Sequence, residues 1–292
     1  MNRIKGILYA AVSSSTFGLA PFFSITLLLA GFSAFEVLSY RWGVASIVLI
    51  VFGWLSGCNF RLAGKDWGVV FLLSLLRAVT SFSLIIAYQN IASGVASTIH
   101  FMYPLAVALA MMFFFREKKS LLVILAVLMS LLGAALLSLG ELEAKSGNTM
   151  VGLVAACVSV FSYAGYIVGV RTTRAVQINS TALTCYVMEL GTIFYLIGAY
   201  CTSGLQLVSD GYTWLIILGL ALPATAISNI TLVQAIKYAG PTLTSILGAM
   251  EPLTAVVIGV FVFKELFTVN SAVGIILILL AVSIVVFRRQ KS

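Results

Sequence analysis

Five ionisable residues lie inside long apolar runs of the sequence, where charged side chains are rare. Four of them are charged, Arg41, Arg77, Glu189 and Glu251, and the fifth is His100, the single histidine of the chain. A charge at the centre of a membrane span opposes insertion by about 2.5–3.5 kcal/mol, so such side chains face the interior of a helix bundle and find partners there. They could form buried ion pairs that fix helix packing, or they could bind a solute and carry a proton.

Glu251 is the best candidate for a proton-carrying group. It precedes Pro252, and a proline removes one backbone hydrogen bond and loosens the helix, where a transporter needs a polar opening. His100 could share this role, because an imidazole gains and loses protons near neutral pH; a plain hydrogen-bonding role is equally open to it. Two arginines and two glutamates could suit a zwitterionic solute, or they could cancel one another.

Aromatic and hydroxyl side chains could complete a cavity around these groups. Tyr40 adjoins Arg41, and Tyr103 follows His100 by three residues, which places both on one face of a helix. Other side chains that could line the cavity or serve helix packing are Ser13, Ser14, Ser15, Thr16, Phe17, Gly18, Pro21, Tyr163, Tyr166 and Tyr186. The predicted substrate-binding or coupling residues are Glu251, Glu189, Arg41, Arg77, His100, Tyr103 and Tyr40.

The elements that must position these residues are membrane-spanning helices. Hydrophobic residues make up 61% of the 292 residues and charged residues only 9%, whereas about a quarter of residues are charged in soluble domains. Apolar runs of this length predict an integral membrane protein with ten spans and short joints. The predicted spans are residues 4–28, 34–55, 67–89, 93–115, 120–140, 150–170, 180–202, 212–235, 242–263 and 268–287.

The composition also weighs against other functional classes. The net charge of +8 comes from scattered basic residues without a basic face for nucleic acid. The four cysteines stand singly rather than as C-x-x-C pairs. A membrane-embedded enzyme is the weakest hypothesis, because one histidine and no aspartate within a span do not supply a catalytic set. We expect no enzyme activity, no cofactor and no metal site.

A segment in the middle of the chain is repeated. Residues 87–117 align without a gap with residues 235–265 and share eight identical residues with them. The copies differ at their centre, where His100 and Tyr103 in the first correspond to Gly248 and Glu251 in the second. This self-similarity predicts a duplicated unit, with one five-helix repeat over residues 1–145 and another over residues 146–292.

The distribution of basic residues predicts the orientation of the repeats. With a cytoplasmic N-terminus, thirteen Lys and Arg residues fall on the inner side and two on the outer side. We therefore expect both termini in the cytoplasm, an uncleaved first span, and a location in the cell inner (plasma) membrane. Because each half has five spans, the second half is inverted relative to the first, a recurrent plan among secondary transporters. The expected fold is an all-α membrane protein with ten transmembrane helices in two inverted five-helix repeats.

The repeated pattern resembles the drug/metabolite transporter (DMT) superfamily, and specifically its EamA-type ten-helix members. Each half contains a Ser/Thr-rich segment, a Pro-Leu pair, an aromatic run and a basic–acidic pair before its last helix. The residues that carry the resemblance are Tyr103-Pro104-Leu105, Glu251-Pro252-Leu253, Arg116-Glu117, Lys264-Glu265 and Ser39-Tyr40-Arg41-Trp42. Two features depart from the family: Phe17 precedes Gly18 where tryptophan is frequent, and Arg77 is outside the common pattern.

The resemblance implies a solute carrier, often an exporter, for amino acids, other metabolites or drug-like compounds, commonly coupled to the proton gradient. We therefore expect a secondary active transporter of a small organic solute that works by alternating access, with its centre formed by spans two, three, four, seven and nine. A passive facilitator or channel is the alternative. The expected partners are a small-molecule substrate, protons and the lipid bilayer, with the oligomeric state left open.

Overall fold

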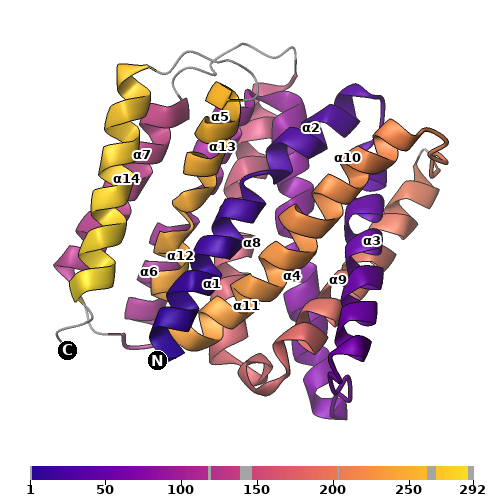
Figure 1. The fold of residues 1–292 in the computed structure, drawn as a ribbon, viewed down its shortest axis with the longest axis horizontal. Helices are drawn as coiled ribbons and strands as arrows, with labels where there is room; N and C mark the ends of the chain where they lie inside the picture. Colours follow the sequence, from indigo (N-terminus) through magenta and orange to yellow (C-terminus); the bar gives the residue numbers. More distant parts are fainter. Residues whose placement is uncertain (1, 118–119, 139–146, 203, 262–267, 289–292) are drawn as a thin grey trace.

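The computed structural model describes residues 2–117, 120–138, 147–202, 204–261 and 268–288, and within these ranges it is built from helices without strands (Figure 1). The helices fall into ten spans that match the predicted ones. The first half contains α1 (Asn2–Phe17) with α2 (Ala20–Leu29), α3 (Ala34–Leu55), α4 (Trp67–Asn90), α5 (Ser93–His100) with α6 (Tyr103–Phe113), and α7 (Leu121–Ser138). The second half contains α8 (Thr149–Thr172), α9 (Ser180–Cys201), α10 (Gly211–Ala221) with η4 (Leu222–Ile227) and α11 (Ser228–Ala239), α12 (Pro241–Leu247) with α13 (Met250–Phe261), and α14 (Val269–Arg288).

The most extensive helix contacts join spans from different halves in an inverted pattern. α1 packs along α11, and α8 packs along α4, so the first span of each half lies against the third span of the other. α3 packs on α9 and α7 packs on α14, which pairs second span with second and fifth with fifth. This arrangement confirms the inverted repeat architecture predicted from the odd number of spans in each half.

Three spans are interrupted near their middle, and a proline follows each interruption. The breaks separate α1 from α2, α5 from α6, and α12 from α13, and the prolines are Pro21, Pro104 and Pro252. Proline has no N–H to donate to the carbonyl four residues earlier, so the helical ladder is broken there. The carbonyls concerned belong to Phe17, His100 and Gly248. The sequence had indicated this loosening only at Pro252.

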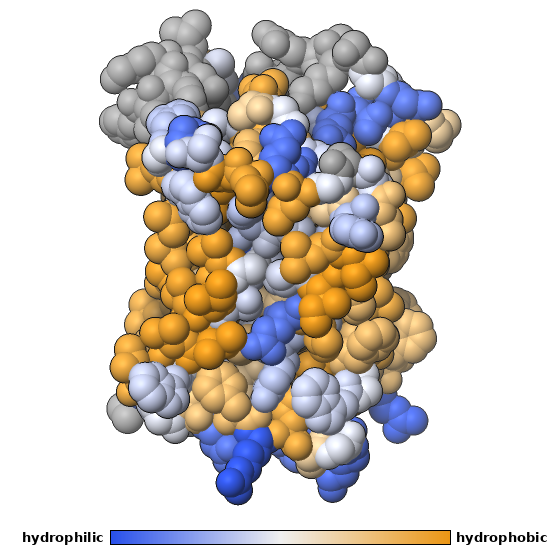
Figure 2. Space-filling view, turned by 90° about the vertical axis from the view of Figure 1, so that its right-hand side faces the viewer, coloured by the Kyte–Doolittle hydropathy of each residue, from blue (hydrophilic) through white to orange (hydrophobic). Residues whose placement is uncertain are grey.

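The surface matches a bilayer-spanning bundle. Hydrophobic residues cover the middle of the molecule, and hydrophilic residues gather at its two ends (Figure 2). Within the described residues, seven segments of at least 18 residues are apolar enough to cross a membrane, and two shorter apolar helices accompany them. α1 begins at the end of the bundle where α14 finishes (Figure 1), as an even number of spans requires.

Some predicted features lie outside the described residues. The boundary between the repeats, at residues 145 and 146, is one, and the Lys264-Glu265 pair is another. Its counterpart Glu117 is described and accepts a hydrogen bond from the Thr242 hydroxyl at 2.6 Å. This contact ties the end of the fourth span to the start of α12, across the two halves.

Candidate functional site

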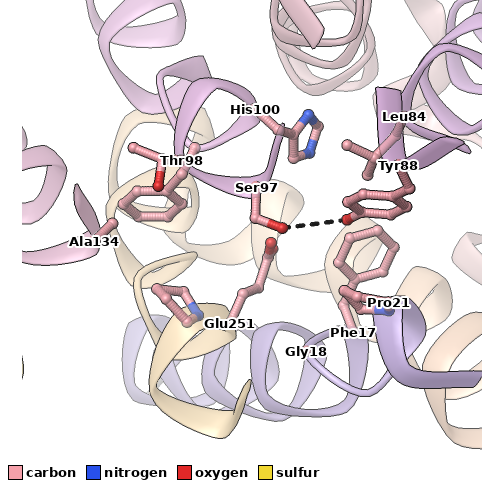
Figure 3. A pocket seen from close by; sticks show the side chains of 12 residues that line it. Phe17, Gly18, Pro21, Leu84, Tyr88, Ser97, Thr98, His100, Ala134 and Glu251 are labelled. Atoms are coloured by element: carbon pink, nitrogen blue, oxygen red, sulfur yellow. Dashed lines mark hydrogen bonds between the residues drawn. The ribbon is translucent and has the colours of Figure 1, made fainter. Parts of the chain in front are cut away.

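A cavity of about 60 Å³ lies where the three interrupted spans meet (Figure 3). Phe17 at the end of α1, His100 at the end of α5 and Glu251 at the start of α13 line it, together with Leu84 and Tyr88 of α4. A helix break frees backbone from its regular ladder and allows polar side chains to be placed inside a bundle. At this volume the cavity holds roughly four water molecules, so a larger solute requires the helices to move apart.

Glu251 projects into this cavity from the first turn of α13. Its side chain is half-buried and extends toward Ser97 of α5 (Figure 3). One carboxylate oxygen, Oε1, accepts a hydrogen bond from the Tyr103 hydroxyl at 3.3 Å. No arginine lies within 4.0 Å of the carboxylate, although the charge of Arg77 acts on it from farther away. The carboxylate is thus held by a neutral donor and stays open to the cavity.

His100 is oriented by a serine of α8. Its side chain is 3% exposed, and Nδ1 lies 2.9 Å from the Ser159 hydroxyl oxygen. That hydroxyl donates its only hydrogen to the carbonyl of Ala156 at 2.6 Å, so it accepts a hydrogen bond from Nδ1–H. This assigns the proton to Nδ1 and leaves Nε2 as an acceptor. Nε2 is buried and has no hydrogen-bond partner among the described residues.

Aromatic rings pack around His100 and hold it in place. The centroids of His100, Tyr103 and Tyr163 lie 4.6–5.5 Å from one another. Phe17 stacks on Tyr163 with 6.5 Å between the ring centroids. These distances are typical of favourable aromatic pairs. The interrupted spans one and four therefore contact α8 through a continuous aromatic cluster.

Arg41 and Arg77 lie on the other side of Phe17. The two side chains are 4% and 1% exposed, and their guanidinium carbons lie 5.5 and 5.3 Å from the centre of the Phe17 ring. Arg77 also lies over the ring of Tyr163, at 5.0 Å. Both distances are within the range of cation–π interactions.

Neutral acceptors of the eighth span and of α4 orient the two guanidinium groups. Nε of Arg41 donates to the Thr225 hydroxyl at 2.7 Å, and Nη2 lies 3.5 Å from the carbonyl of Ala224. Nε of Arg77 donates to the Asn229 amide oxygen at 3.0 Å, and Nη1 donates to the Ser81 hydroxyl at 3.3 Å. Neither arginine pairs with a carboxylate in the part of the chain that the structure describes. The ion-pair interpretation of the four intramembrane charges is therefore wrong for these described residues.

A π-helical turn places Thr225 beside Arg41. The turn η4 contains Pro223, and the Thr225 hydroxyl donates to the carbonyl of Leu220 at 2.7 Å while accepting from Arg41. π-turns inside α-helices are frequent at functional sites. Here the turn brings one hydroxyl to a buried guanidinium, and the same hydroxyl donates to a carbonyl of its own span.

The structure brings five of the seven predicted site residues to this centre: Arg41, Arg77, His100, Tyr103 and Glu251. Glu189 and Tyr40 line neither of its two cavities. Glu189 accepts a contact from the Cys185 thiol, on its own helix, at 3.4 Å. The Tyr40 hydroxyl donates to the carbonyl of Gln206, and its ring packs edge-on to Trp214. Tyr40 therefore anchors the joint between α9 and α10 instead of lining a cavity.

The expected set of spans needs a correction as well. Span seven contributes neither carboxylate nor lining residue to the two cavities. Spans one, six and eight contribute instead, through Phe17, Ser159, Tyr163, Thr225 and Asn229. Phe17 and Tyr163 had been recognised as possible lining residues. Ser159, Thr225 and Asn229 had not been recognised. The only sequence feature that marks them is a polar residue within an apolar run, and many residues that serve helix packing have the same feature.

The described residues contain no group of three or more His, Cys, Asp or Glu side chains that could hold a metal ion. The donor set of the centre is two guanidinium groups, one imidazole, one carboxylate and several hydroxyls. Such a set can bind an organic solute by charge and hydrogen bonds and can exchange a proton at Glu251.

Comparisons with known proteins agree with the arrangement of the helices. The profile of the EamA-like transporter family matches residues 4–139 and, separately, residues 150–287. One solved crystal structure is similar in fold with a TM-score of 0.79 and 17% sequence identity, over 97% of this chain and 96% of that chain. No curated protein matches the sequence.

Proposed function

Because the chain belongs to the EamA-like transporter family, which moves small solutes across membranes, we propose that it is a secondary active exporter coupled to protons at Glu251. The protein is a multi-pass membrane transporter. We place it in the cell inner membrane with both termini in the cytoplasm, and assign residues 1–145 and 146–292 to the two repeats. No enzyme activity is part of this proposal.

The observation that carries the proposal is the state of the Glu251 carboxylate. It lines the central cavity, has a neutral hydrogen-bond donor in Tyr103, and has no ion-pair partner among the described residues. A carboxylate locked in a buried ion pair would serve packing and resist protonation. A carboxylate that faces a cavity can take up a proton there and release it after the cavity has opened to the other side.

The inverted contacts support alternating access. Since α1 with α11 and α8 with α4 are equivalent pairs in opposite orientation, the two halves can exchange conformations and open one shared site to each side in turn. The interruptions at Phe17, His100 and Gly248 lie beside that site and can act as hinges. A solute bound near Glu251 would then cross the membrane while the cavity is open to only one side at a time.

The test is solute flux in proteoliposomes that contain the purified full-length protein. A pH gradient is expected to drive saturable accumulation of a solute from an amino-acid and metabolite panel, and a protonophore is expected to abolish it. Glu251→Gln should remove the response to the gradient while leaving solute exchange. Glu189→Gln should keep the response, because that carboxylate lies outside the cavities.

Three outcomes contradict the proposal. Absence of gradient-driven flux with any solute removes the assignment of secondary active transport. Flux that never saturates with solute concentration favours a passive facilitator or channel. Intact coupling in Glu251→Gln, with loss of coupling in Glu189→Gln, would move the proton site to α9.

A further inference from the structure

Two like charges lie side by side at the centre of the bundle without a counter-charge. Arg41 and Arg77 both line a second, smaller cavity of about 10 Å³, and both lie against the same ring of Phe17. The two positive charges act on each other directly. Within the described residues, no carboxylate is within ion-pair distance of either one. Such an arrangement is costly in a membrane interior.

The protein compensates for this cost only in part. The four hydrogen-bond acceptors of the two guanidinium groups are two hydroxyls, one amide oxygen and one backbone carbonyl, all of them neutral. These acceptors fix the direction of each planar group, and the rings of Phe17 and Tyr163 add cation–π attraction. Neither kind of partner supplies a negative charge. The two guanidinium groups are held in position, but their positive charge is not balanced by these partners.

The nearest intramembrane carboxylate does not balance both arginines. Glu251 lies on the adjoining cavity, which shares Phe17, Leu84 and Tyr88 with the smaller one. The centre thus contains two positive charges and one negative charge, and it lacks one negative charge. The small cavity has room for about one water molecule, or for one oxygen of a carboxylate.

We infer that the transported solute is an organic anion whose carboxylate binds between Arg41 and Arg77, while the rest of the molecule occupies the cavity at Glu251. This inference rests on the proposed function and names the class of its substrate. A monoanion brings the charge of the centre to zero when Glu251 is ionised. A planar guanidinium matches a carboxylate with two parallel hydrogen bonds, and the aromatic walls formed by Phe17 and Tyr163 suit an apolar or aromatic body.

The same geometry sets the sign of the coupling. A proton on Glu251 removes the negative charge that a bound anion faces, so anion and proton bind together more readily than either binds alone. The other titratable or charged groups around Glu251 are neutral or positive: Tyr88 and Arg77 of α4, His100 of α5, Tyr103 of α6 and Tyr163 of α8. Anion and proton therefore move in the same direction, so a pH gradient drives the anion toward the side that receives the protons.

Binding to the purified full-length protein tests the charge requirement directly. The probes are matched sets that differ only in the head group: 3-phenylpropionate, 3-phenylpropanamide and 3-phenylpropylamine, with butyrate, butanamide and butylamine as a small aliphatic set. We expect a carboxylate to raise the thermal midpoint of the wild type and its amide and amine to leave it unchanged. Arg41→Gln and Arg77→Gln should weaken carboxylate binding at least about tenfold, or about 1.4 kcal/mol.

Control variants separate recognition from folding. Arg61 is exposed in the joint between α3 and α4, so Arg61→Gln should bind like the wild type. Arg41→Lys and Arg77→Lys keep the charge but lose the paired hydrogen bonds, and they should retain part of the affinity. If the glutamine variants do not fold, the wild-type comparison of head groups still decides.

The results that would overturn the anion inference differ from those that would overturn the proposed transport function. If neutral or cationic probes bind as tightly as carboxylates, or if no carboxylate binds while another solute shows saturable gradient-driven flux, the substrate is not an anion and the proposed transport function still stands. If no solute shows saturable flux, the proposed function itself fails. A pH-sensitive dye inside proteoliposomes should report faster acidification than in protein-free liposomes when the carboxylate is added outside, because the neutral acid also crosses bilayers unaided. Alkalinisation relative to protein-free liposomes would contradict the shared direction.

Discussion

The Tyr103 hydroxyl donates a hydrogen bond to the Glu251 carboxylate at 3.3 Å, and these two residues occupy equivalent positions in the two copies of the repeated segment, 148 residues apart. Divergence of the repeat at this position has therefore produced a donor on one side of the centre and an acceptor on the other. A steric fit also joins the two copies at Gly248, the position equivalent to His100. A Cβ atom built on Gly248 would overlap the Tyr103 hydroxyl, so a glycine in one copy makes room for the tyrosine of the other.

Removal of the Tyr103 hydroxyl is expected to impair coupled transport without unfolding the protein. Tyr103→Phe removes one hydrogen bond to a carboxylate, a contact worth about 1.5–3 kcal/mol in general, and should slow gradient-driven flux at least about fivefold. Tyr166→Phe is the matched control, because the buried Tyr166 hydroxyl has no hydrogen-bond partner in the part of the chain that the structure describes. Initial flux rates in proteoliposomes measure the effect, and equal rates for the two variants would contradict a role for the Tyr103 hydroxyl.

Gly248→Ala is expected to destabilise the protein by about 1–3 kcal/mol, since an added methyl group has to displace a packed ring. Tyr103→Phe should relieve part of this loss in the double variant; the ring carbon that carries the hydroxyl still lies 2.9 Å from the built Cβ. Gly68→Ala is the control, because nothing lies within 4 Å of a Cβ at that position of α4. Thermal unfolding in detergent measures all three, and additive effects in the double variant would argue against the contact.

Thr225→Val is expected to weaken solute binding roughly tenfold, because the Arg41 Nε–H then loses its acceptor inside the bundle. Thr225→Ser keeps the hydroxyl and should bind like the wild type. Thr231→Val, six residues further along the same span, removes a hydroxyl that bonds only to its own helix and should be neutral. The three variants are compared by equilibrium binding of the solute identified in the flux assay. Unchanged affinity in Thr225→Val would mean that Arg41 is positioned by other contacts.

Ser159→Ala is expected to lower stability by about 1–3 kcal/mol, because Nδ1–H of the buried His100 loses its partner. It should also weaken solute binding, since the His100 ring, which lines the cavity, is then no longer held in one orientation. Ser46→Ala is a buried control whose hydroxyl bonds only to the Gly43 carbonyl of its own helix. Unfolding and binding are measured on the same preparations. Unchanged binding in Ser159→Ala would leave His100 with a purely structural role.

The orientation of the chain can be tested with a membrane-impermeant maleimide in intact cells. Cys201 is exposed at the end of α9 that we place outside, and a protein that keeps only this cysteine should be labelled. A cysteine-free variant with Lys65→Cys, in the joint before α4, should be labelled only after the cells are broken. The opposite pattern would reverse the predicted topology.

The number of spans and their inverted order could be predicted because they depend on features that can be read segment by segment along the sequence. Apolar run length gives the spans, and the excess of basic residues gives an orientation for each joint. The packing of α1 on α11 and of α4 on α8 then follows from five spans in each half. The breaks before Pro21 and Pro104 were missed, because proline is tolerated in transmembrane helices without a break when neighbours satisfy the backbone.

The candidate site was only partly predictable, because charge inside a span marks a residue as important without giving its partner. Arg41, Arg77, His100, Tyr103 and Glu251 lie together around the two cavities. Glu189 of α9 lines neither cavity. Helix rotation and the π-turn at Thr225 depend on contacts between spans far apart in sequence, and a single sequence carries no direct record of them.

Phe17 lines both the Glu251 cavity and the arginine cavity, together with Leu84 and Tyr88, and both guanidinium groups lie near its ring. The two cavities have volumes of about 60 and 10 Å³, and Phe17 stands at a helix break, where a small backbone rotation moves its ring. The size of this one side chain thus limits the size of a solute that can reach the arginines. A smaller residue at position 17 would join the two cavities and broaden the range of solutes transported.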